Sequence, residues 1–473
     1  MQRLKKIGRV QPKYAAQIKS SRLGIGFEKL DRALFDPEKA YDKLAAIGVK
    51  WVRIQSGWKR TESAKGVYDF NWIDQIVDNL LSRGLTPWID LAWGNDLYTT
   101  FAADFFGAVG CPPVDTEEER RGWRNYCTAL AAHFKGRVEY FEVWNEPDLR
   151  YGWRHKETVV GTKGTPNATE YAAFTIATSK ALKAGNADAK VIGFALAHPK
   201  ASISYLSEAA TAGIFEHIDA ASYHLYSTDF ANRVRYAKNF IDTVHHYAPD
   251  LPIIQGESGT QSRFSEAGAL REMNWDEQKQ AKFLLRQIIC DLASEVLFTS
   301  YFSTMDMAEA LNGIVGQAQS FHDYGYFGVL AAEFDENGVA SGEYHEKPSY
   351  FALQTMASLL FGDVKENSFP YIFNAEECRF VNGFSRCDEK TAHHCFTLDD
   401  GSHLLAYWQN TKLLEETFDG VTTVELLHSG NIELIDPMDG SIYALPESMV
   451  ERNGTALTLR HIPLRDYPLL LHF

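Results

Sequence analysis

The chain has 473 residues, of which 45% are hydrophobic and 13% aromatic, and its formal net charge is −15. This length and apolar content allow a large core and favour a barrel-sized domain joined to a smaller one. The negative charge argues against nucleic-acid and anionic-membrane partners, which need a basic surface, and no stretch is apolar enough to cross a membrane.

The first 361 residues alternate between short apolar runs and amphipathic segments. This alternation predicts a (β/α)8 barrel over residues 1–361, because each parallel strand needs a crossover helix to reach the next one. The expected strands are 22–27, 50–55, 86–93, 138–146, 191–195, 218–226, 252–257 and 297–304. The expected helices are 37–47, 72–81, 116–134, 168–184, 204–212, 231–247, 276–295 and 348–360.

Beyond residue 361 the pattern changes to short alternating runs separated by turn signals such as Asp439-Gly440 and Asn453-Gly454. Such runs are typical of antiparallel strands joined by tight turns. We therefore predict a small antiparallel β-sandwich domain over residues 362–473. Its expected strands are 394–398, 403–409, 422–427, 432–435, 456–459 and 468–473.

The basic N-terminal segment MQRLKKIGRVQPKYAAQ is not followed by an apolar run, so it does not have the pattern of a signal peptide. The six cysteines show no tight spacing, which is typical of reduced thiols. They are Cys111, Cys127, Cys290, Cys378, Cys387 and Cys395. We expect a cytoplasmic protein, although a secreted chain that has lost its leader would have the same pattern.

The sequence VEYFEVWNEPDL, residues 138–149, contains the fourth expected strand, and Asn145 and Glu146 lie where this strand passes into a loop. Pro147 ends the strand, and Trp144 gives Glu146 an apolar neighbour. A carboxyl group on an apolar surface favours its protonated form near neutral pH, since burial disfavours the charge. Glu146 is therefore a candidate general acid, although an isolated Asn-Glu-Pro is more often a surface feature.

The seventh expected strand, PIIQG, also ends in a glutamate, Glu257. Two carboxylates at strand ends of one parallel barrel meet at its C-terminal mouth. Hydrolysis of a glycosidic bond by an acid and a nucleophile requires this arrangement.

These motifs resemble those of the retaining glycoside hydrolases of clan A, whose barrels carry Asn-Glu at strand four and Glu at strand seven. The form of strand four and the C-terminal β-domain are most similar to family 39, the group of β-xylosidases and α-L-iduronidases, with some similarity to families 5 and 30. The resemblance covers most of residues 22–361.

The resemblance implies that Glu146 is the general acid/base and Glu257 the nucleophile. It also implies that Asn145 binds the sugar 2-hydroxyl and that Arg53 lies near the nucleophile. His224 and Tyr226, in the sequence SYHLY, lie on the sixth expected strand. In the clan this strand carries an aromatic or hydroxyl group that is hydrogen-bonded to the nucleophile, and the resemblance implies this role for one of these two residues. Independently, a nearby arginine keeps a nucleophilic carboxylate ionised, although Arg53 could instead be a structural ion-pair partner.

Aromatic residues near the strand ends are candidates for sugar contacts, since aromatic faces stack on sugar rings and barrel loops build the site. The candidates are Trp93 after strand three, Trp153 in the loop after strand four and Tyr301 on strand eight. Clan members commonly end strand eight with a tryptophan under the sugar. This chain has FTSYFSTMD there, without a tryptophan, so the sequence does not identify the residue that lies under the sugar.

Three functional hypotheses follow. The first is an exo-acting retaining β-glycosidase, similar to the β-xylosidases, whose pocket is roofed by residues 93–110 and 147–165. The second is an endo-acting β-glycanase with an open groove, and the third is a non-catalytic carbohydrate-binding barrel. The expected partner is a carbohydrate substrate; a homo-oligomer is compatible with the sequence, which does not specify one.

No cofactor and no metal are expected. Cys387, His393, His394 and Cys395 lie close in sequence, but their spacing matches no standard zinc arrangement.

Overall fold

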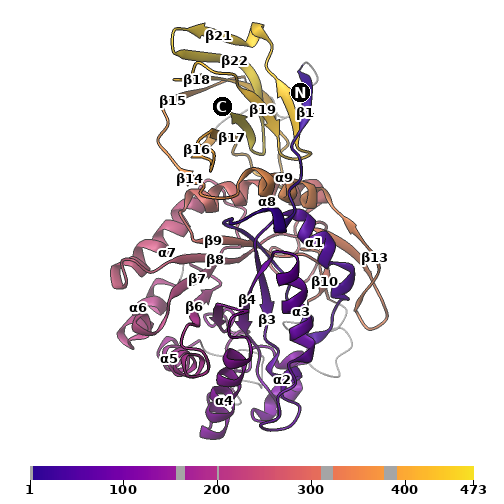
Figure 1. Cartoon of the computed structure of the whole chain (residues 1–473), viewed down its shortest axis with the longest axis vertical. Helices are drawn as coiled ribbons and strands as arrows, with labels where there is room; N and C mark the ends of the chain where they lie inside the picture. Colours follow the sequence, from indigo (N-terminus) through magenta and orange to yellow (C-terminus); the bar gives the residue numbers. More distant parts are fainter. Residues whose placement is uncertain (1–3, 156–165, 200–201, 310–322, 378–390) are drawn as a thin grey trace.

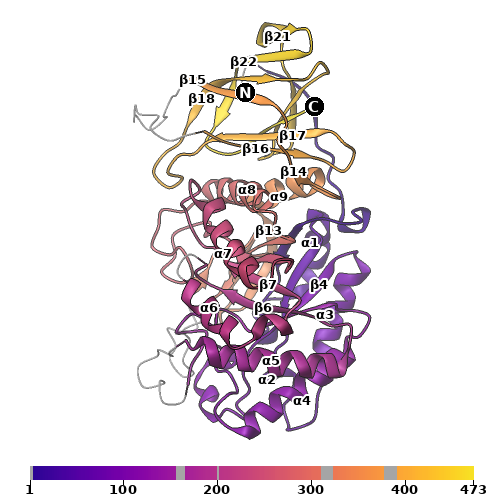
Figure 2. The same cartoon turned by 90° about the vertical axis from the view of Figure 1, so that its left-hand side faces the viewer.

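A computed structural model describes residues 4–155, 166–199, 202–309, 323–377 and 391–473. Within these residues the chain forms a closed barrel of eight parallel strands surrounded by helices, with an antiparallel domain at one end (Figures 1 and 2). The predicted fold class, a (β/α)8 barrel with a smaller C-terminal β-sandwich, is confirmed.

The barrel strands follow one another in chain order, and the first closes the ring by pairing in parallel with the last. The strands are β2 (Leu23–Gly26), β3 (Trp51–Gln55), β4 (Thr86–Leu91), β5 (Tyr140–Val143), β6 (Lys190–Leu196), β7 (Ala220–His224), β8 (Ile253–Ser258) and β9 (Phe298–Tyr301). The helices are α1 (Tyr41–Ile47), α2 (Trp58–Thr61), α3 (Asn71–Ser82), α4 (Glu117–His133), α5 (Ala168–Gly185), α6 (Ile203–Thr211), α7 (Arg233–Tyr247), α8 (Glu277–Ala293) and α9 (Pro348–Leu359).

The two ends of the barrel interior have opposite character. At the N-terminal end, rings from the early parts of three strands pack together, and the Trp51 and Phe298 ring centroids are 4.4 Å apart. Trp88 packs against both of these rings. Further along the strands, Arg53 and Glu142 are fully buried inside the barrel. Because apolar side chains close one end, the polar C-terminal mouth is the end that can hold a ligand.

The C-terminal domain consists of two antiparallel sheets that share one apolar core. The larger sheet has the order β1-β20-β19-β23-β17-β16-β14, and the smaller has the order β15-β18-β22-β21. Their bounds are β1 (Lys5–Arg9), β14 (Lys365–Glu366), β15 (Tyr371–Glu377), β16 (Thr391–Thr397), β17 (His403–Gln409), β18 (Asp419–Leu426), β19 (Glu433–Asp436), β20 (Ser441–Ala444), β21 (Val450–Asn453), β22 (Ala456–Arg465) and β23 (Leu469–His472). Strand β1 pairs with β20, so the start of the chain completes a sheet of the C-terminal domain.

The connection between β9 and α9 contains two short antiparallel pairs that the sequence pattern did not indicate. They are β10 (Met307–Ala308) with β11 (Tyr324–Gly325), and β12 (Leu330–Phe334) with β13 (Ala340–Glu346). The connection brings Glu309 and Phe327 to the mouth of the barrel.

Helices α8 and α9 lie between the barrel and the sandwich (Figure 1). The buried Arg286 of α8 crosses this boundary. Its Nε donates to the backbone oxygen of Asp466 at 2.9 Å, and its Nη1 donates to the backbone oxygen of Thr411 at 2.9 Å. Lys282, one turn earlier, pairs with the Asp466 carboxylate at 2.6 Å. A barrel helix therefore satisfies buried carbonyl groups of the sandwich.

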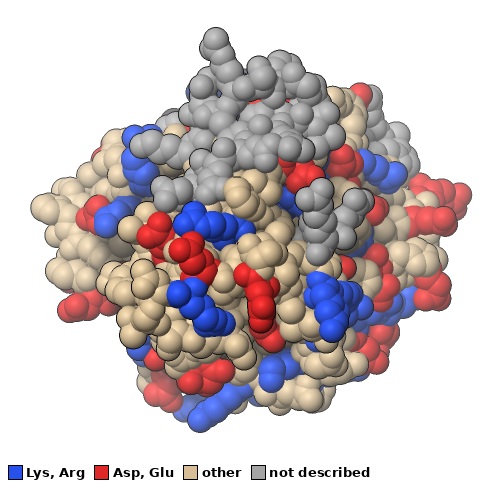
Figure 3. Space-filling model, turned by 90° about the horizontal axis from the view of Figure 1, so that it is seen from above, with Lys and Arg blue, Asp and Glu red and all other residues tan. Residues whose placement is uncertain are grey.

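Seen from the sandwich end, the described surface carries acidic and basic side chains close to one another rather than one continuous basic patch (Figure 3). Among the described residues, no helix has the length and apolarity needed to cross a membrane. The expectation that nucleic acid is not a partner stays a prediction.

Replacing Arg286 with leucine is expected to lower the free energy of unfolding by about 2–4 kcal/mol, because buried carbonyl groups lose their donor. Calorimetric thermal unfolding measures this change. Arg235→Leu, at an exposed position of α7, is the matched control and should unfold close to the wild-type temperature. Equal unfolding temperatures for the two variants would show that the Arg286 contacts add no stability.

Candidate active site

Glu146 follows β5 on a tightly folded turn. Trp144 and Glu146 have positive φ angles of 68° and 49°, which are uncommon for residues other than glycine and often mark functional sites. The Trp144 indole donates to the backbone oxygen of Gly152 at 2.6 Å, which folds the loop back on itself. A Cβ atom on Gly152 would lie 2.1 Å from the Glu146 carbonyl oxygen, so only glycine fits there. The turn fixes the direction of the Glu146 side chain.

The surroundings of Glu146 favour its protonated form. Burial raises the pKa of this carboxyl to about 8, and the negative charge of Asp148 adds to the effect. Asp148 is held in place by the backbone N–H groups of Ala197 and His198, at 2.9 and 3.2 Å, and by the Ser202 hydroxyl at 2.8 Å. A carboxyl group that keeps its proton at neutral pH is suited to general acid catalysis.

Glu257 lies within β8 and accepts two hydrogen bonds. The Tyr226 hydroxyl donates to one carboxylate oxygen at 2.6 Å, and Arg53 Nη1 donates to the other at 2.8 Å. Burial raises the pKa of the Tyr226 hydroxyl, so the phenol keeps the proton that it donates. A cation and a phenol are the partners that a carboxylate anion requires.

Arg53 is the centre of the polar network inside the barrel. Its Nε donates to Glu142 at 2.7 Å, and its Nη2 donates to the Asn145 side-chain oxygen at 2.9 Å. Glu28 and Asp90 also lie within 3.5 Å of the guanidinium.

The network holds more carboxyl groups than cations. Burial disfavours the charge of Arg53, but the surrounding carboxylates outweigh this and raise its pKa. Burial also raises the pKa values of Glu28 and Asp90, so these two acids keep their protons more readily than exposed ones.

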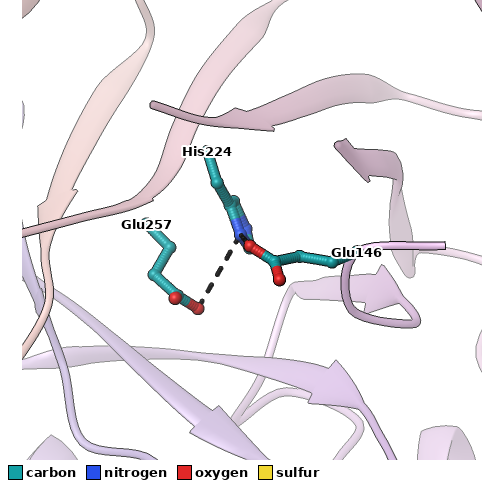
Figure 4. Close-up of side chains that lie close together, drawn as sticks. All are labelled: Glu146, His224 and Glu257. Atoms are coloured by element: carbon teal, nitrogen blue, oxygen red, sulfur yellow. Dashed lines mark hydrogen bonds and ion pairs between the residues drawn. The ribbon is translucent and has the colours of Figure 1, made fainter. Parts of the chain in front are cut away.

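The carboxylates of Glu146 and Glu257 point into the same space, with the His224 imidazole beside both (Figure 4). An oxygen of each and a ring nitrogen of His224 all lie within 4.8 Å of one another. His224 Nδ1 is hydrogen-bonded to Glu146 at 3.0 Å and lies 3.8 Å from Glu257. Burial lowers the pKa of His224, so the imidazole is neutral.

These three side chains could also coordinate a divalent cation, since they offer carboxylate and imidazole ligands. The neighbouring Arg53 guanidinium already balances the Glu257 charge at 2.8 Å and would repel a second cation. The observed contacts therefore fit a pair of acid–base groups better than a metal centre.

A cavity of about 530 Å³ opens above the two glutamates. It is lined by Trp93, Leu149 and Tyr151 from the two loops that the sequence predicted as a roof. Residues 156–165 of the second loop lie outside the described residues. Residues 268–271 and Met273, from the loop after β8, add a wall that the sequence pattern did not indicate.

The structure brings most of the predicted site residues together. Asn145, Glu146, Tyr226, Glu257 and Trp93 line the cavity, and Arg53 and His224 lie directly behind them. Trp153 and Tyr301 do not line it. Trp153 is buried behind Trp144 and donates to Glu170, while Tyr301 points into the protein and the next residue, Phe302, faces the cavity.

Several lining residues were missed in the sequence. Lys29 and Glu309 form a buried ion pair at 3.0 Å across the ends of the first and eighth barrel strands, and His198 lies near Glu146. Glu28 and Lys29 directly follow the first strand, and this position was the available signal for them. Glu309 is contributed by the irregular connection after β9, which has no pattern of its own.

A parallel barrel with two convergent glutamates at its C-terminal mouth defines the class of barrel glycoside hydrolases. The particular family follows from comparison with known proteins. The chain belongs to the glycosyl hydrolases family 39, whose model matches residues 39–368. The family resemblance seen in the sequence is thereby confirmed.

Individual relatives are distant. A β-xylosidase of Geobacillus stearothermophilus is 31% identical over 99 residues, and the match spans 19% of each chain. The fold is similar to that of a family 39 glycoside hydrolase from Bacteroides cellulosilyticus WH2, with a TM-score of 0.61, 17% identity and coverage of 95% of this chain and 80% of that one. A monomeric β-xylosidase from Caulobacter crescentus CB15 has a TM-score of 0.58, 18% identity and coverage of 98% and 97%.

Tyr226→Phe removes one of the two hydrogen bonds to Glu257 and is expected to lower kcat/KM about tenfold to a hundredfold, since a hydrogen bond to a charged group is lost. The rate of aryl glycoside hydrolysis measures this effect. The control is Tyr223→Phe, three residues earlier on β7, because the buried Tyr223 hydroxyl has no hydrogen-bond partner among the described residues. Equal losses in both variants would contradict a specific role for Tyr226.

Asp148→Asn is expected to move the alkaline limb of the pH profile of kcat/KM to lower pH. The negative charge of Asp148 raises the pKa of Glu146, so removing that charge lets Glu146 lose its proton sooner. Other charged or titratable groups near Glu146 are Arg53, His198, His224, Glu257 and Glu309. These groups stay unchanged in the variant.

The control for this prediction is Ser202→Ala, which removes a hydrogen bond to Asp148 but keeps the charge. Its alkaline limb should stay at the wild-type pH. An alkaline limb that does not move in Asp148→Asn would show that this charge does not influence the ionisation of Glu146.

Proposed function

We propose that the protein is a retaining, exo-acting β-glycosidase that removes a terminal sugar from oligosaccharides or glycosides, with β-xylosides as the substrate class. The observation that carries the proposal is the approach of the Glu146 and Glu257 carboxylates to within 4.8 Å. Retaining glycosidases have their two carboxyl groups about 5–5.5 Å apart, while inverting enzymes need about 6.5–9.5 Å to admit a water molecule.

In the first step, the Glu257 carboxylate attacks the anomeric carbon while Glu146 gives its proton to the departing oxygen. The glycosidic bond breaks, and the sugar is joined to Glu257 as an ester. In the second step, the Glu146 carboxylate takes a proton from water, and the resulting oxygen nucleophile displaces Glu257 from the same carbon. Two inversions give net retention, and both carboxyl groups return to their starting states.

The environments of the two glutamates support these roles. Glu146 is buried beside Asp148, which favours a proton donor, and Glu257 accepts hydrogen bonds from Arg53 and Tyr226, which suit an anion. Asn145 lies between Arg53 and the cavity, where it can bind a sugar hydroxyl. Trp93, Leu149 and Tyr151 at the rim support a closed pocket and thus exo action. The choice of xylose is supported by the distant β-xylosidase relatives.

The proposal is tested with Glu146→Ala and Glu257→Ala, an aryl β-xyloside with a good leaving group, and added azide. Such a leaving group needs little protonation, so Glu146→Ala should still form the glycosyl-enzyme. Azide, which needs no general base, should then restore turnover and give a β-glycosyl azide. Loss of acid–base assistance is worth about a hundredfold to ten-thousandfold, so the rescue is large enough to measure.

In Glu257→Ala, azide should occupy the space left by the carboxylate and give the α-glycosyl azide. If the two variants give the opposite product configurations, the roles of the glutamates are reversed. If aryl β-xylosides are not hydrolysed but longer internal-bond substrates are, the endo-acting alternative replaces the exo-acting one.

A further inference from the structure

We propose that Tyr171, on helix α5 outside the ring of barrel strands, is a positioning residue that sets the direction of Glu146 through the backbone. This role rests on the proposed function, which makes Glu146 the general acid, and it adds a residue to the structure that holds this acid in place. Tyr171 is fully buried and is not among the residues that line the catalytic cavity. Its influence on the reaction must therefore pass through other residues.

Strand β6 is distorted close to Glu146. Phe194 and Ala195 have positive φ angles of 80° and 46°. The register between β6 and β7 shifts here, because the three steps from Gly193 to Leu196 on β6 lie opposite only two steps on β7. Bulges of this kind and positive φ angles outside glycine cost free energy, so they persist only where neighbouring groups hold the backbone.

The Tyr171 hydroxyl holds this distorted segment against β5. It accepts a hydrogen bond from the Phe194 N–H at 2.6 Å and donates one to the Val143 carbonyl oxygen at 3.0 Å. The last residue pair between the two strands is Glu142 with Ile192, so the hydroxyl joins them just beyond the end of their pairing. Burial raises the pKa of this hydroxyl, so it keeps the proton that it donates.

The same segment of β6 also holds the backbone of Glu146. The Glu146 N–H donates to the carbonyl oxygen of Ala195 at 3.1 Å. Val143, whose carbonyl group accepts from Tyr171, is the last residue of β5 and lies three residues before Glu146. One hydroxyl therefore fixes both the strand that leads into Glu146 and the strand that receives its N–H. A misplacement of about 1 Å in a catalytic group can lower a rate about a hundredfold, so this support matters for the chemistry.

The Tyr171 ring is itself held in place by other aromatic rings. The ring centroids of Trp153 and Tyr205 lie 5.8 and 6.1 Å from it. Trp153 also packs against Trp144, the second residue before Glu146. Close-packed rings in a core resist displacement. Trp153, which the sequence suggested as a sugar contact, thus belongs to the support of the acid rather than to the cavity.

Tyr171→Phe removes only the hydroxyl group, and two substrates separate its effect on Glu146 from a general loss of structure. With an alkyl β-xyloside, whose departing oxygen needs a proton, kcat/KM should fall about tenfold or more. With a dinitrophenyl β-xyloside, which leaves without a proton, it should fall less than about twofold. Damage to the barrel as a whole would lower both rates to the same extent.

The matched control is Tyr407→Phe in the sandwich. The buried Tyr407 hydroxyl donates to the Pro463 carbonyl oxygen at 2.9 Å, so this variant loses a hydrogen bond of the same kind away from the barrel. It should hydrolyse both substrates at the wild-type rates. Thermal unfolding of the two variants measures their stability, and similar unfolding temperatures are expected because each loses one buried hydrogen bond.

A second measurement does not depend on activity. Hydrogen–deuterium exchange of the peptides that cover residues 143–149 and 193–198 reports how firmly these two segments are held. Exchange in both should be about tenfold faster in Tyr171→Phe, because local opening no longer breaks the hydrogen bonds of the hydroxyl. In Tyr407→Phe it should stay at the wild-type rate.

The positioning role is overturned if Tyr171→Phe loses activity equally with the two leaving groups, or if exchange of residues 143–149 does not change. Either result in a wild-type protein that hydrolyses both xylosides leaves the proposed function intact. If the wild-type protein hydrolyses neither xyloside, the proposed function fails. The exchange rates alone then decide whether Tyr171 holds the Glu146 loop.

Discussion

The site depends on one buried cation, the guanidinium of Arg53. It is fully enclosed by the barrel and reaches carboxyl groups from several strands, among them Glu142 and Glu257. A buried cation is tolerated only when it is paired and hydrogen-bonded, so the strands that supply its partners must close around it. The same contacts fix Glu257 and Asn145 at the mouth of the barrel. The contacts that stabilise the barrel interior are therefore the same contacts that position the site.

The proposed chemistry needs two carboxyl groups of the same type to behave differently at one pH. The fold achieves this by placing them on opposite sides of the cavity with different neighbours. Glu257 faces the donors Arg53 and Tyr226, while Glu146 stands at the end of a buried aromatic strand beside Asp148. His224 lies between them as a neutral group and adds no charge that would favour one over the other. Separate environments for paired acids are how a fold assigns acid and nucleophile.

Much of the barrel was predictable because its strands read as apolar runs between amphipathic helices. Glu146 and Glu257 were predictable because each ends such a run, and parallel strands bring their ends to one face. Trp153 and Tyr301 illustrate the limit of this reasoning. Their positions in sequence are compatible with the site, but side-chain packing turns Trp153 behind Trp144 and leaves Phe302, not Tyr301, at the cavity.

The parts that were not predictable arise from contacts between distant segments. Strand β1 has no distinctive pattern of its own and is defined by its pairing with β20, at the far end of the chain. Glu309 directly follows the short strand β10, and its place at the cavity depends on the pairing of β10 with β11 and on its ion pair with Lys29. Such residues are placed by tertiary packing, which local periodicity does not encode.

The most direct test of the central claim is to identify the residue that becomes covalently bound to the sugar. An aryl 2-deoxy-2-fluoro-β-xyloside with a good leaving group should inactivate the wild-type enzyme, because the fluorine slows the second step more than the activated first step. Mass spectrometry of the digested protein is predicted to find one fluorosugar, attached to Glu257. A sugar attached to Glu146, or to any residue other than Glu257, would contradict the assignment of nucleophile and acid.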